Sequence, residues 1–265
     1  MKTDRKDRIR RAKAARNSYK PRRLPQQAAS PAPEGPRTPF HPGMDIPVLL
    51  ETPRFLILDK PAGLAVHPGP STQDSVETRL LPHPRGGPWL AHRLDADTSG
   101  CLLVARRKTA LIEAQKAFQE RQVRKLYWAV VVGDLSPDSG EIDAPLLRQS
   151  DALGWRMVVD AKGDEARTRW RVLGRSKGLC WVELELLTGR THQARIHCAE
   201  LGTPILGDPV YGPPAPNGSA PPVLHLLARS LELNLPSDTL SAQASPPEFM
   251  AETLRAMRCD SVAQS

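Results

Sequence analysis

The segment LCWVELELLTG, residues 179–189, alternates apolar and polar side chains with the period of two expected for a half-buried β-strand. Its apolar residues at positions 182, 184 and 186 fall on one side, and Glu183 and Glu185 fall on the other. The segment before it, EARTRWRVLG (165–174), alternates in the same way, with arginine at positions 167, 169 and 171. Two such strands indicate an antiparallel or mixed sheet that packs one face on a core.

Four more segments predict strands, because apolar, β-branched and aromatic residues dominate them. They are IPVLLE (46–51), RFLILDK (54–60), GCLLVARR (100–107) and RKLYWAVVVGDL (124–135). In the last of these, Tyr127 shares a face with Lys125 and Ala129. The sequence therefore predicts an α+β fold, built on a mixed, largely antiparallel sheet with flanking helices on one side.

Three helices are predicted between and after these strands. The first, TALIEAQKAFQER (109–121), has Leu111, Ala114 and Phe118 at helical spacing and Thr109 as its N-cap. The second, RTHQARIHCAELG (190–202), ends at a glycine that is followed by proline. The third, PPEFMAETLRAMR (246–258), is expected at the periphery of the fold.

The N-terminal segment differs in composition from the rest of the chain. Residues 1–43 hold 12 Lys and Arg against 3 acidic residues and are rich in proline, whereas the remaining residues hold 25 against 26. Such a composition buries no core, so we expect a disordered, basic, Pro-rich tail with a short helix near residues 4–18. The predicted domains are this tail, a folded body over 44–236, and a C-terminal extension over 237–265. The sequence PPAPNGSAPP (213–222) predicts a loop on the surface of the body.

Composition also restricts the class of protein. The chain of 265 residues has a formal net charge of +8, most of it in the tail, which suits an electrostatic arm for phosphate backbones or a solvated solubility segment. No apolar run reaches the roughly 20 residues of a transmembrane helix, and the N-terminus lacks the apolar segment of a secretory signal. The four cysteines have no zinc or redox spacing. We expect a cytoplasmic protein with reduced thiols.

The segment AHRLDADTSG (91–100) gathers polar residues just before an apolar strand. As a calcium loop it would need a bidentate acid where Arg106 stands, which makes calcium a poor fit. As a glycosidase site it would use Asp95 and Asp97 together, although such acids usually come from different elements. A plain turn explains Asp97 and the Thr-Ser-Gly that follows it. A turn does not explain His92, Arg93 and Asp95.

The stretch HRLDADTSG resembles the signature motif of the RluA-type pseudouridine synthases, which isomerise uridine in ribosomal RNA and tRNA. Other segments are similar to further motifs of that family and occur in the same order along the chain. They are LDKPAGLAVHPG (58–69), RKLYWAVVVG (124–133), LLTGRTHQARIHCAELGTPILGDPVYG (186–212) and LHLLARSLEL (224–233). The resemblance covers roughly residues 46–236 and implies the family's fold, with its active-site cleft across one face of the sheet.

The resemblance also implies catalytic roles for three residues. Asp95 would act on the ribose, either as a nucleophile at C1′ or as a base at C2′. Tyr127 would lie against the uracil and assist removal of the C5 proton, although an ordinary half-buried strand tyrosine has the same local sequence. Arg195 would pair with Asp95 and keep it ionised. The reaction is an isomerisation and an intramolecular transfer, so no cofactor is expected.

Five further residues are predicted to contact RNA: His92, Arg93, Arg190, His192 and Gln193. The target uridine must leave its stack, and the planar guanidinium of Arg93 suits the vacated space or the flipped nucleotide. A solvent-exposed polar role is equally open for each of these residues. His67 and His197 are expected to be structural, and no metal site is predicted, because the spacing of His192 and His197 does not place them on one helical face.

The expected partner is RNA, either large-subunit ribosomal RNA or tRNA, with no membrane and no metal, and the protein is expected to be a monomer. Residues 1–43 leave no room for the S4-type RNA-binding domain of some members of that family, so we expect the shorter form of the family. Two alternatives stay open on the residues alone. One is a non-catalytic RNA-binding protein, and the other is a two-carboxylate glycoside hydrolase.

Overall fold

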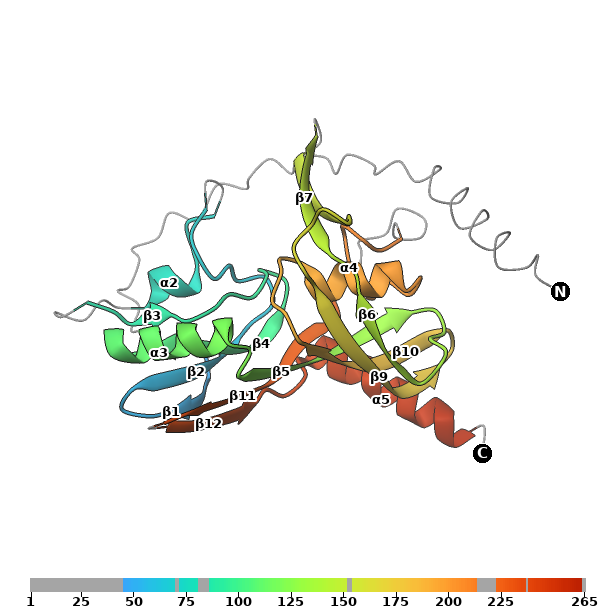
Figure 1. Ribbon diagram of the computed structural model, residues 1–265. Helices are drawn as coiled ribbons and strands as arrows, with labels where there is room; N and C mark the ends of the chain where they lie inside the picture. The colour runs from blue at the N-terminus through green and yellow to red at the C-terminus, as the bar shows by residue number, and fades with distance from the viewer. Residues whose placement is uncertain are drawn as a thin grey trace. The chain divides into compact units, whose positions relative to one another are not determined.

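The computed structural model describes residues 45–69, 72–80, 86–151, 154–213, 223–236 and 238–263. The predicted tail over 1–43, its short helix, and all but the first residue of the loop over 213–222 lie outside these ranges. Among the described residues, ten strands form one sheet (Figure 1). A second sheet pairs β7 (Leu146–Asp151) with β8 (Gly154–Val159).

The main sheet is mixed and largely antiparallel, as the sequence predicts. Its strands in spatial order are β1 (Val48–Glu51), β2 (Phe55–Lys60), β4 (Ser99–Ala105), β11 (Leu226–Leu235), β5 (Val123–Val132), β10 (Leu179–Leu186), β9 (Arg167–Ser176) and β6 (Ser139–Asp143). Two further strands, β12 (Asp238–Gln243) and β3 (Trp89–Leu90), pair with β11 and β4. β11 runs parallel to β4 and antiparallel to β5, so it joins the two halves of the sheet.

A glycine permits the parallel contact between β4 and β11. Gly100 has φ +105°, and a Cβ atom at this position would lie 2.3 Å from the carbonyl oxygen of Ala228 on β11. Any side chain would force the two strands apart or strain the backbone. The glycine that ends the HRLDADTSG motif is therefore required for the approach of β11.

The two faces of the sheet follow the alternation seen in the sequence. On β5, Tyr127 lies opposite Leu184 of β10, which in turn lies opposite Trp170 of β9, and all three belong to one buried cluster. Val130 of β5 and Trp181 of β10 belong to the cluster on the opposite face. Both faces therefore present apolar side chains that helices must cover.

Helices cover both faces, which corrects the prediction that they lie on one side. α4 (Gln193–Glu200) and α2 (Val76–Arg79) bury Ala194, Cys198 and Val76 on the Tyr127 face. α3 (Lys108–Gln119) and α5 (Glu248–Ala263) bury alanines, methionines and Leu254 on the opposite face. α4 and α5 are visible on the two sides of β9 and β10 in Figure 1. Within the described ranges, no helix is long and apolar enough to cross a membrane.

Two helix starts also differ from prediction. α3 is preceded by Arg107, which makes no side-chain cap, so Thr109 is not its N-cap. α4 begins at Gln193 rather than at Arg190. His192 has left-handed backbone angles (φ 56°, ψ 16°), so the helix cannot extend from Gln193 toward Arg190. The predicted C-terminal helix is part of the core, since Met250 is fully buried. The thiols of Cys101, Cys180 and Cys198 are free and buried.

Candidate active site

Asp95 lies in the turn between β3 and β4, above a fully buried lysine. The ammonium of Lys60 donates hydrogen bonds to the carbonyl oxygens of Pro61 (2.9 Å), Leu64 (2.8 Å) and Ala96 (2.8 Å). Burial lowers the pKa of Lys60 to about 8, although the charges of Asp97 and Asp95 oppose that shift. Because Ala96 follows Asp95 directly, the buried ammonium fixes the backbone of the turn that carries this carboxylate.

Arg195 brings a guanidinium to Asp95 from the first turns of α4. Its Nη1 lies 3.8 Å from Oδ2 of Asp95, while Nε and Nη2 each donate a 2.8 Å hydrogen bond to the carboxylate of Asp208. Asp208 also accepts the backbone N–H groups of Val210 and Tyr211, both at 2.9 Å. The bidentate pair fixes the guanidinium plane, so that its remaining nitrogen faces Asp95.

Burial and charge act in opposite directions on this pair. Burial by itself raises the pKa of Asp208, but the hydrogen bonds and charge of Arg195 outweigh it and lower the pKa. Burial likewise lowers the pKa of Arg195, and the carboxylates of Asp208 and Asp95 raise it above its ordinary value. Arg195 is therefore a permanent cation beside Asp95, whose side chain is 18% exposed and open to a substrate.

His192 approaches the same carboxylate from the residue before α4. Its Nε2 lies 3.8 Å from Oδ2 of Asp95, and its Nδ1 lies 2.9 Å from the hydroxyl of Tyr211. The indole of Trp155, on β8, stacks on the imidazole with ring centroids 5.4 Å apart, and the guanidinium of Arg148 lies over that indole at 4.7 Å. Trp155 is 47% exposed, so this stack reaches the surface.

Tyr127 lies on the face of β5 that carries this site and is almost fully buried. Burial, followed by the charges of Asp95 and Cys101, raises the pKa of Tyr127 well above its usual range. The phenol therefore stays protonated at neutral pH. Three predicted catalytic residues, Asp95, Arg195 and Tyr127, thus belong to one neighbourhood.

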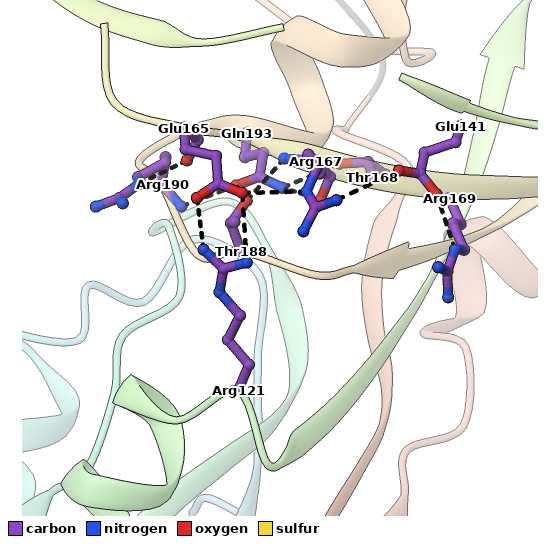
Figure 2. A network of polar contacts seen from close by, with 9 residues as sticks. All are labelled: Arg121, Glu141, Glu165, Arg167, Thr168, Arg169, Thr188, Arg190 and Gln193. Carbon is purple, nitrogen blue, oxygen red and sulfur yellow. Dashed lines mark hydrogen bonds and ion pairs between the residues drawn. The ribbon is translucent and has the colours of Figure 1, made fainter. Parts of the chain in front are cut away.

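Gln193, which was predicted to contact RNA, is 1% exposed, and its amide groups are already hydrogen-bonded within the fold. Contact between Gln193 and RNA stays a prediction. Its Oε1 accepts from Thr188 and from the backbone of Arg190, and its Nε2 donates to Arg167 and Thr168 (Figure 2). Gln193 therefore ties the start of α4 to β9. The polar residue type suggested contact with RNA, but sequence alone does not reveal its burial.

The side chain of His92 also makes contacts within the protein. Its Nε2 accepts the backbone N–H of Leu103 at 3.0 Å, and its ring packs on Phe118 of α3 at 5.0 Å between centroids. Burial lowers the pKa of His92 to about 4. Contact between His92 and RNA stays a prediction. Arg93, by contrast, is exposed, and its charge acts on His192.

The two histidines expected to be structural have protein partners. His197 is buried and lies 2.8 Å from the hydroxyl of Thr168 and 3.1 Å from the carbonyl of Ala144. His67 pairs with Glu77 at 2.8 Å on the surface. Over the described ranges, no group of three or more His, Cys, Asp or Glu side chains is arranged to hold a metal ion.

A basic cleft of about 370 Å³ opens where β5 and β9 begin and β10 ends. Its ionisable lining consists of Arg121, Arg124, Lys125, Arg167 and Arg169, with Glu185 as the acid among them. Glu165 lies 2.6 Å from Arg121 and 3.1 Å from Arg167, and Glu141 lies 2.9 Å from Arg169 (Figure 2). Glu165 and Glu141 therefore bind the arginines that line the cleft but are not themselves part of its lining.

The cleft adjoins the face of the sheet that carries Tyr127. Lys125 is two residues from Tyr127 on β5, which places their Cα atoms about 7 Å apart on the same face. Arg190, predicted to contact RNA, is exposed beside the cleft, and it bonds the backbone of Glu165 at 3.0 Å and lies 3.5 Å from Asp164.

Sequence reasoning missed four residues of this site: Lys60, Asp208, Tyr211 and Trp155. Three of them belong to segments that were already singled out, LDKPAGLAVHPG and the long segment over 186–212. Their residue types gave no sign that Asp208 would bind Arg195, that Tyr211 would contact His192, or that Lys60 would bind the turn at Ala96. Trp155 lies in a segment that gave no functional signal.

Comparison with known proteins identifies the family of this chain. Residues 54–200 match the family described as RNA pseudouridylate synthase. An uncharacterized RNA pseudouridine synthase of Zymomonas mobilis is 42% identical over 154 residues, which cover 57% of this chain and 70% of that protein. A ribosomal large subunit pseudouridine synthase D of Nitrosomonas europaea is 39% identical over 227 residues, which cover 80% of this chain and 65% of that protein.

A solved structure has the same fold. Human RNA pseudouridylate synthase domain containing 4 superposes with a TM-score of 0.65 at 28% identity, covering 80% of this chain and 92% of that one. The chain spans about half the length of most curated relatives it matches. From the matched sequence and the shared fold together, the chain belongs to the RNA pseudouridylate synthase family.

Proposed function

We propose that this protein converts a specific uridine of ribosomal RNA or tRNA to pseudouridine, with Asp95 as the reacting carboxylate. The observation that carries the proposal is the arrangement around Asp95. This accessible carboxylate faces Nη1 of Arg195 at 3.8 Å, and Arg195 is itself fixed by Asp208. A fixed cation at this distance orients the carboxylate, as nucleophilic or basic attack on the ribose requires.

The reaction needs no external oxidant or co-reactant. The bond between ribose C1′ and uracil N1 breaks, the base turns, and a new bond forms between C1′ and C5. The proton on C5 then leaves and N1 gains one, so the product has the same atoms as the substrate. Asp95 acts either by attack on C1′ or by removal of the C2′ proton, and both routes use the anion.

Tyr127 assists the step at C5 in this proposal. Its ring offers a flat surface to the uracil, and its hydroxyl lies in a site where burial and Asp95 raise the pKa of Tyr127. Phenolate is therefore scarce at neutral pH. The hydroxyl serves as a hydrogen-bonded relay for the departing proton rather than as a standing base.

The basic cleft supports a path for the RNA backbone beside this site. Five cations and one acid line it. One of these cations, Lys125, is two residues from Tyr127 on β5, about 7 Å away along the strand. Phosphate contacts of this kind position RNA without reading its sequence. Arg93 and Arg190, both exposed, extend the set of candidate contacts to the flipped nucleotide and its neighbours. The name of the Nitrosomonas relative supports ribosomal RNA as the first substrate to test.

The matched pair Asp95→Asn and Asp97→Asn tests the proposal. Pseudouridine is mapped in total RNA from cells that lack the gene and are complemented with each variant, and the purified proteins are assayed on the RNA so identified. We expect Asp95→Asn to abolish conversion while RNA binding is kept, and the exposed Asp97→Asn to stay active. Turnover above a few per cent for Asp95→Asn would contradict the assignment. Equal loss in both variants would favour a two-carboxylate hydrolase instead.

A further inference from the structure

We infer that Tyr211 fixes the tautomer of His192, so that the neutral imidazole presents an N–H group to the carboxylate of Asp95. His192 is thereby a second donor to this carboxylate, beside Arg195, and Tyr211 acts through it as a positioning residue. The inference rests on the proposed function of Asp95. It assigns to His192 a role other than direct contact with RNA.

The hydroxyl of Tyr211 has two neighbours whose chemistry sets its orientation. The backbone N–H of Met157 donates to the hydroxyl oxygen at 3.3 Å, and Nδ1 of His192 lies 2.9 Å away. Met157 supplies a donor only, so the acceptor available to the hydroxyl proton in this pair is Nδ1. When Nδ1 accepts, the proton of a neutral imidazole resides on Nε2.

The protonated nitrogen is the one that faces Asp95. Nε2 of His192 and Nη1 of Arg195 both lie 3.8 Å from the same oxygen, Oδ2. A movement of less than 1 Å by the carboxylate brings both donors within hydrogen-bonding distance. With the other tautomer, a lone pair on Nε2 would face the anion and repel it.

The neutrality of the ring follows from its surroundings. The turn before β4 contributes Asp95 and Arg93, α4 contributes Arg195, and the segment after α4 contributes Asp208. The charges of the two cations and the two carboxylates oppose each other, and burial, the largest effect, lowers the pKa of His192. A ring that is neutral at neutral pH has its proton on either Nδ1 or Nε2, and the position of this proton decides whether Asp95 meets an N–H group or a lone pair.

The position of the ring is constrained on the remaining sides. Its backbone lies in the left-handed region at φ 56°. The indole of Trp155 stacks on it at an interplanar angle of 28°, and the ring of Tyr211 meets it edge-on at 78°. The imidazole therefore cannot turn to exchange its two nitrogens without breaking the bond to Tyr211.

Nitrogen NMR of the intact protein, labelled with ¹⁵N-histidine, tests the tautomer directly. The His192 signals are assigned by their loss in His192→Gln. We expect the wild-type ring to be neutral and protonated on Nε2. In Tyr211→Phe, which keeps the aromatic ring but loses the hydroxyl, we expect signals shifted toward a mixture of tautomers. A ring protonated on Nδ1, or signals unchanged in Tyr211→Phe, would overturn the inference.

A pair of amide variants tests the consequence for turnover. The amide nitrogen of His192→Gln reaches the place of Nε2 and keeps a donor for Asp95, whereas that of His192→Asn reaches only the place of Nδ1. Asparagine tolerates left-handed backbone angles well, so the backbone does not favour the Gln variant. We expect kcat to stay within about threefold for Gln and to fall roughly 10- to 100-fold for Asn, the effect of one hydrogen bond to a charged group, with similar KM.

Thermal unfolding of each variant checks that the fold is kept. Equal kcat values for the Gln and Asn variants, in a protein whose wild type makes pseudouridine, would refute the role of His192 and leave the proposed function intact. A wild type that modifies no RNA would refute the proposed function, and the NMR spectra would still decide the tautomer.

Discussion

Asp208 accepts two hydrogen bonds of 2.8 Å from Arg195, and its side chain has no exposed surface. The pair is therefore a buried ion pair whose third participant, Asp95, is the residue proposed to react. Removal of one partner from such a pair leaves a buried charge without compensation, which costs more than the pair itself contributes.

The variant Asp208→Asn should therefore lose both stability and turnover. Asn keeps an oxygen for the N–H groups of Val210 and Tyr211 but loses the charge opposite Arg195. We expect the free energy of unfolding, measured with urea, to fall by about 3–5 kcal/mol. The control is Asp164→Asn, whose carboxylate pairs with Arg190 at 3.5 Å and is 71% exposed. Its effect should stay within about 0.5 kcal/mol, and equal losses in the two variants would contradict the role of burial.

The variant Tyr127→Phe should distinguish the contribution of the Tyr127 ring from that of its hydroxyl. The ring, which is proposed to lie against the base, is kept, so RNA affinity should change little, while kcat should fall roughly 10²-fold or more if the hydroxyl relays the C5 proton. Because the pKa of Tyr127 is raised by burial and by Asp95, its titration should not appear in the wild-type pH–rate profile below pH 10. Single-turnover assays and binding assays measure the two quantities. Unchanged turnover would return Tyr127 to a structural role.

The ammonium of Lys60 should limit activity at alkaline pH. Burial lowers the pKa of Lys60 to about 8, so the folded protein loses this proton above pH 8. A neutral amine has two N–H groups for three carbonyl oxygens, and the turn that carries Asp95 should loosen. We expect turnover to decline with a midpoint near pH 8, and the Lys60 resonance of ¹³C-labelled lysine to titrate at the same pH. Lys125→Met removes the other lysine whose pKa burial lowers to about 8, and so assigns the signal.

The lowered pKa of Lys60 also predicts how stability changes with pH: turnover should fall as the pH rises, whereas the free energy of unfolding should increase. The unfolded chain keeps the lysine proton up to a pKa of about 10.4, whereas the folded chain releases it near 8. Between these values the unfolded state binds more protons, so the contribution of Lys60 to the free energy of unfolding rises with pH. The rise should amount to roughly 3 kcal/mol at most, and it should be absent below pH 8. A Lys60 titration midpoint near 10 would contradict both predictions.

The basic cleft should appear in the salt dependence of RNA binding. Each phosphate contact on single-stranded RNA contributes about 0.7 to the slope of log K against log salt. If Arg124 and Arg169 each contact one phosphate, the double variant Arg124→Gln/Arg169→Gln should flatten the slope by about 1.4. Arg171→Gln is the matched control, because Arg171 is on the same strand, is exposed, and pairs with Glu183 outside the cleft. Equal slopes for the wild type and the double variant would exclude the cleft from the RNA path.

The strands of this fold were predictable because alternation along a strand is a local property. The period of two in residues 165–174 and 179–189 assigns β9 and β10 and the direction of the arginines of β9, and the structure confirms it. The parallel pairing of β4 with β11 was not predictable from local pattern, since more than 120 residues separate Gly100 from Ala228. Helices on both faces were missed because the alternation in 165–174 and 179–189 does not extend to the whole sheet, whereas the continuous apolar run of β4 is buried along its whole length.

The site was partly predictable for a related reason. Asp95 and Arg195 lie in segments that resemble a family signature, and the structure brings them within 3.8 Å. The burial of Gln193 was not predictable, because a glutamine at a helix start has the same residue type whether it meets RNA or the backbone of a neighbouring strand. The orientation of Arg195 depends on Asp208, thirteen residues later, and no local pattern links the two.

The position of β11 has a consequence for synthesis on the ribosome. The chain emerges from its N-terminus, so Lys60, Asp95, Tyr127 and Arg195 all leave the exit tunnel before residues 226–235. Until that last central strand arrives, β1, β2 and β4 lack their bridge to β5, β10 and β9. The nascent chain therefore cannot assemble Asp95 opposite Arg195 until residues 226–235 have left the exit tunnel.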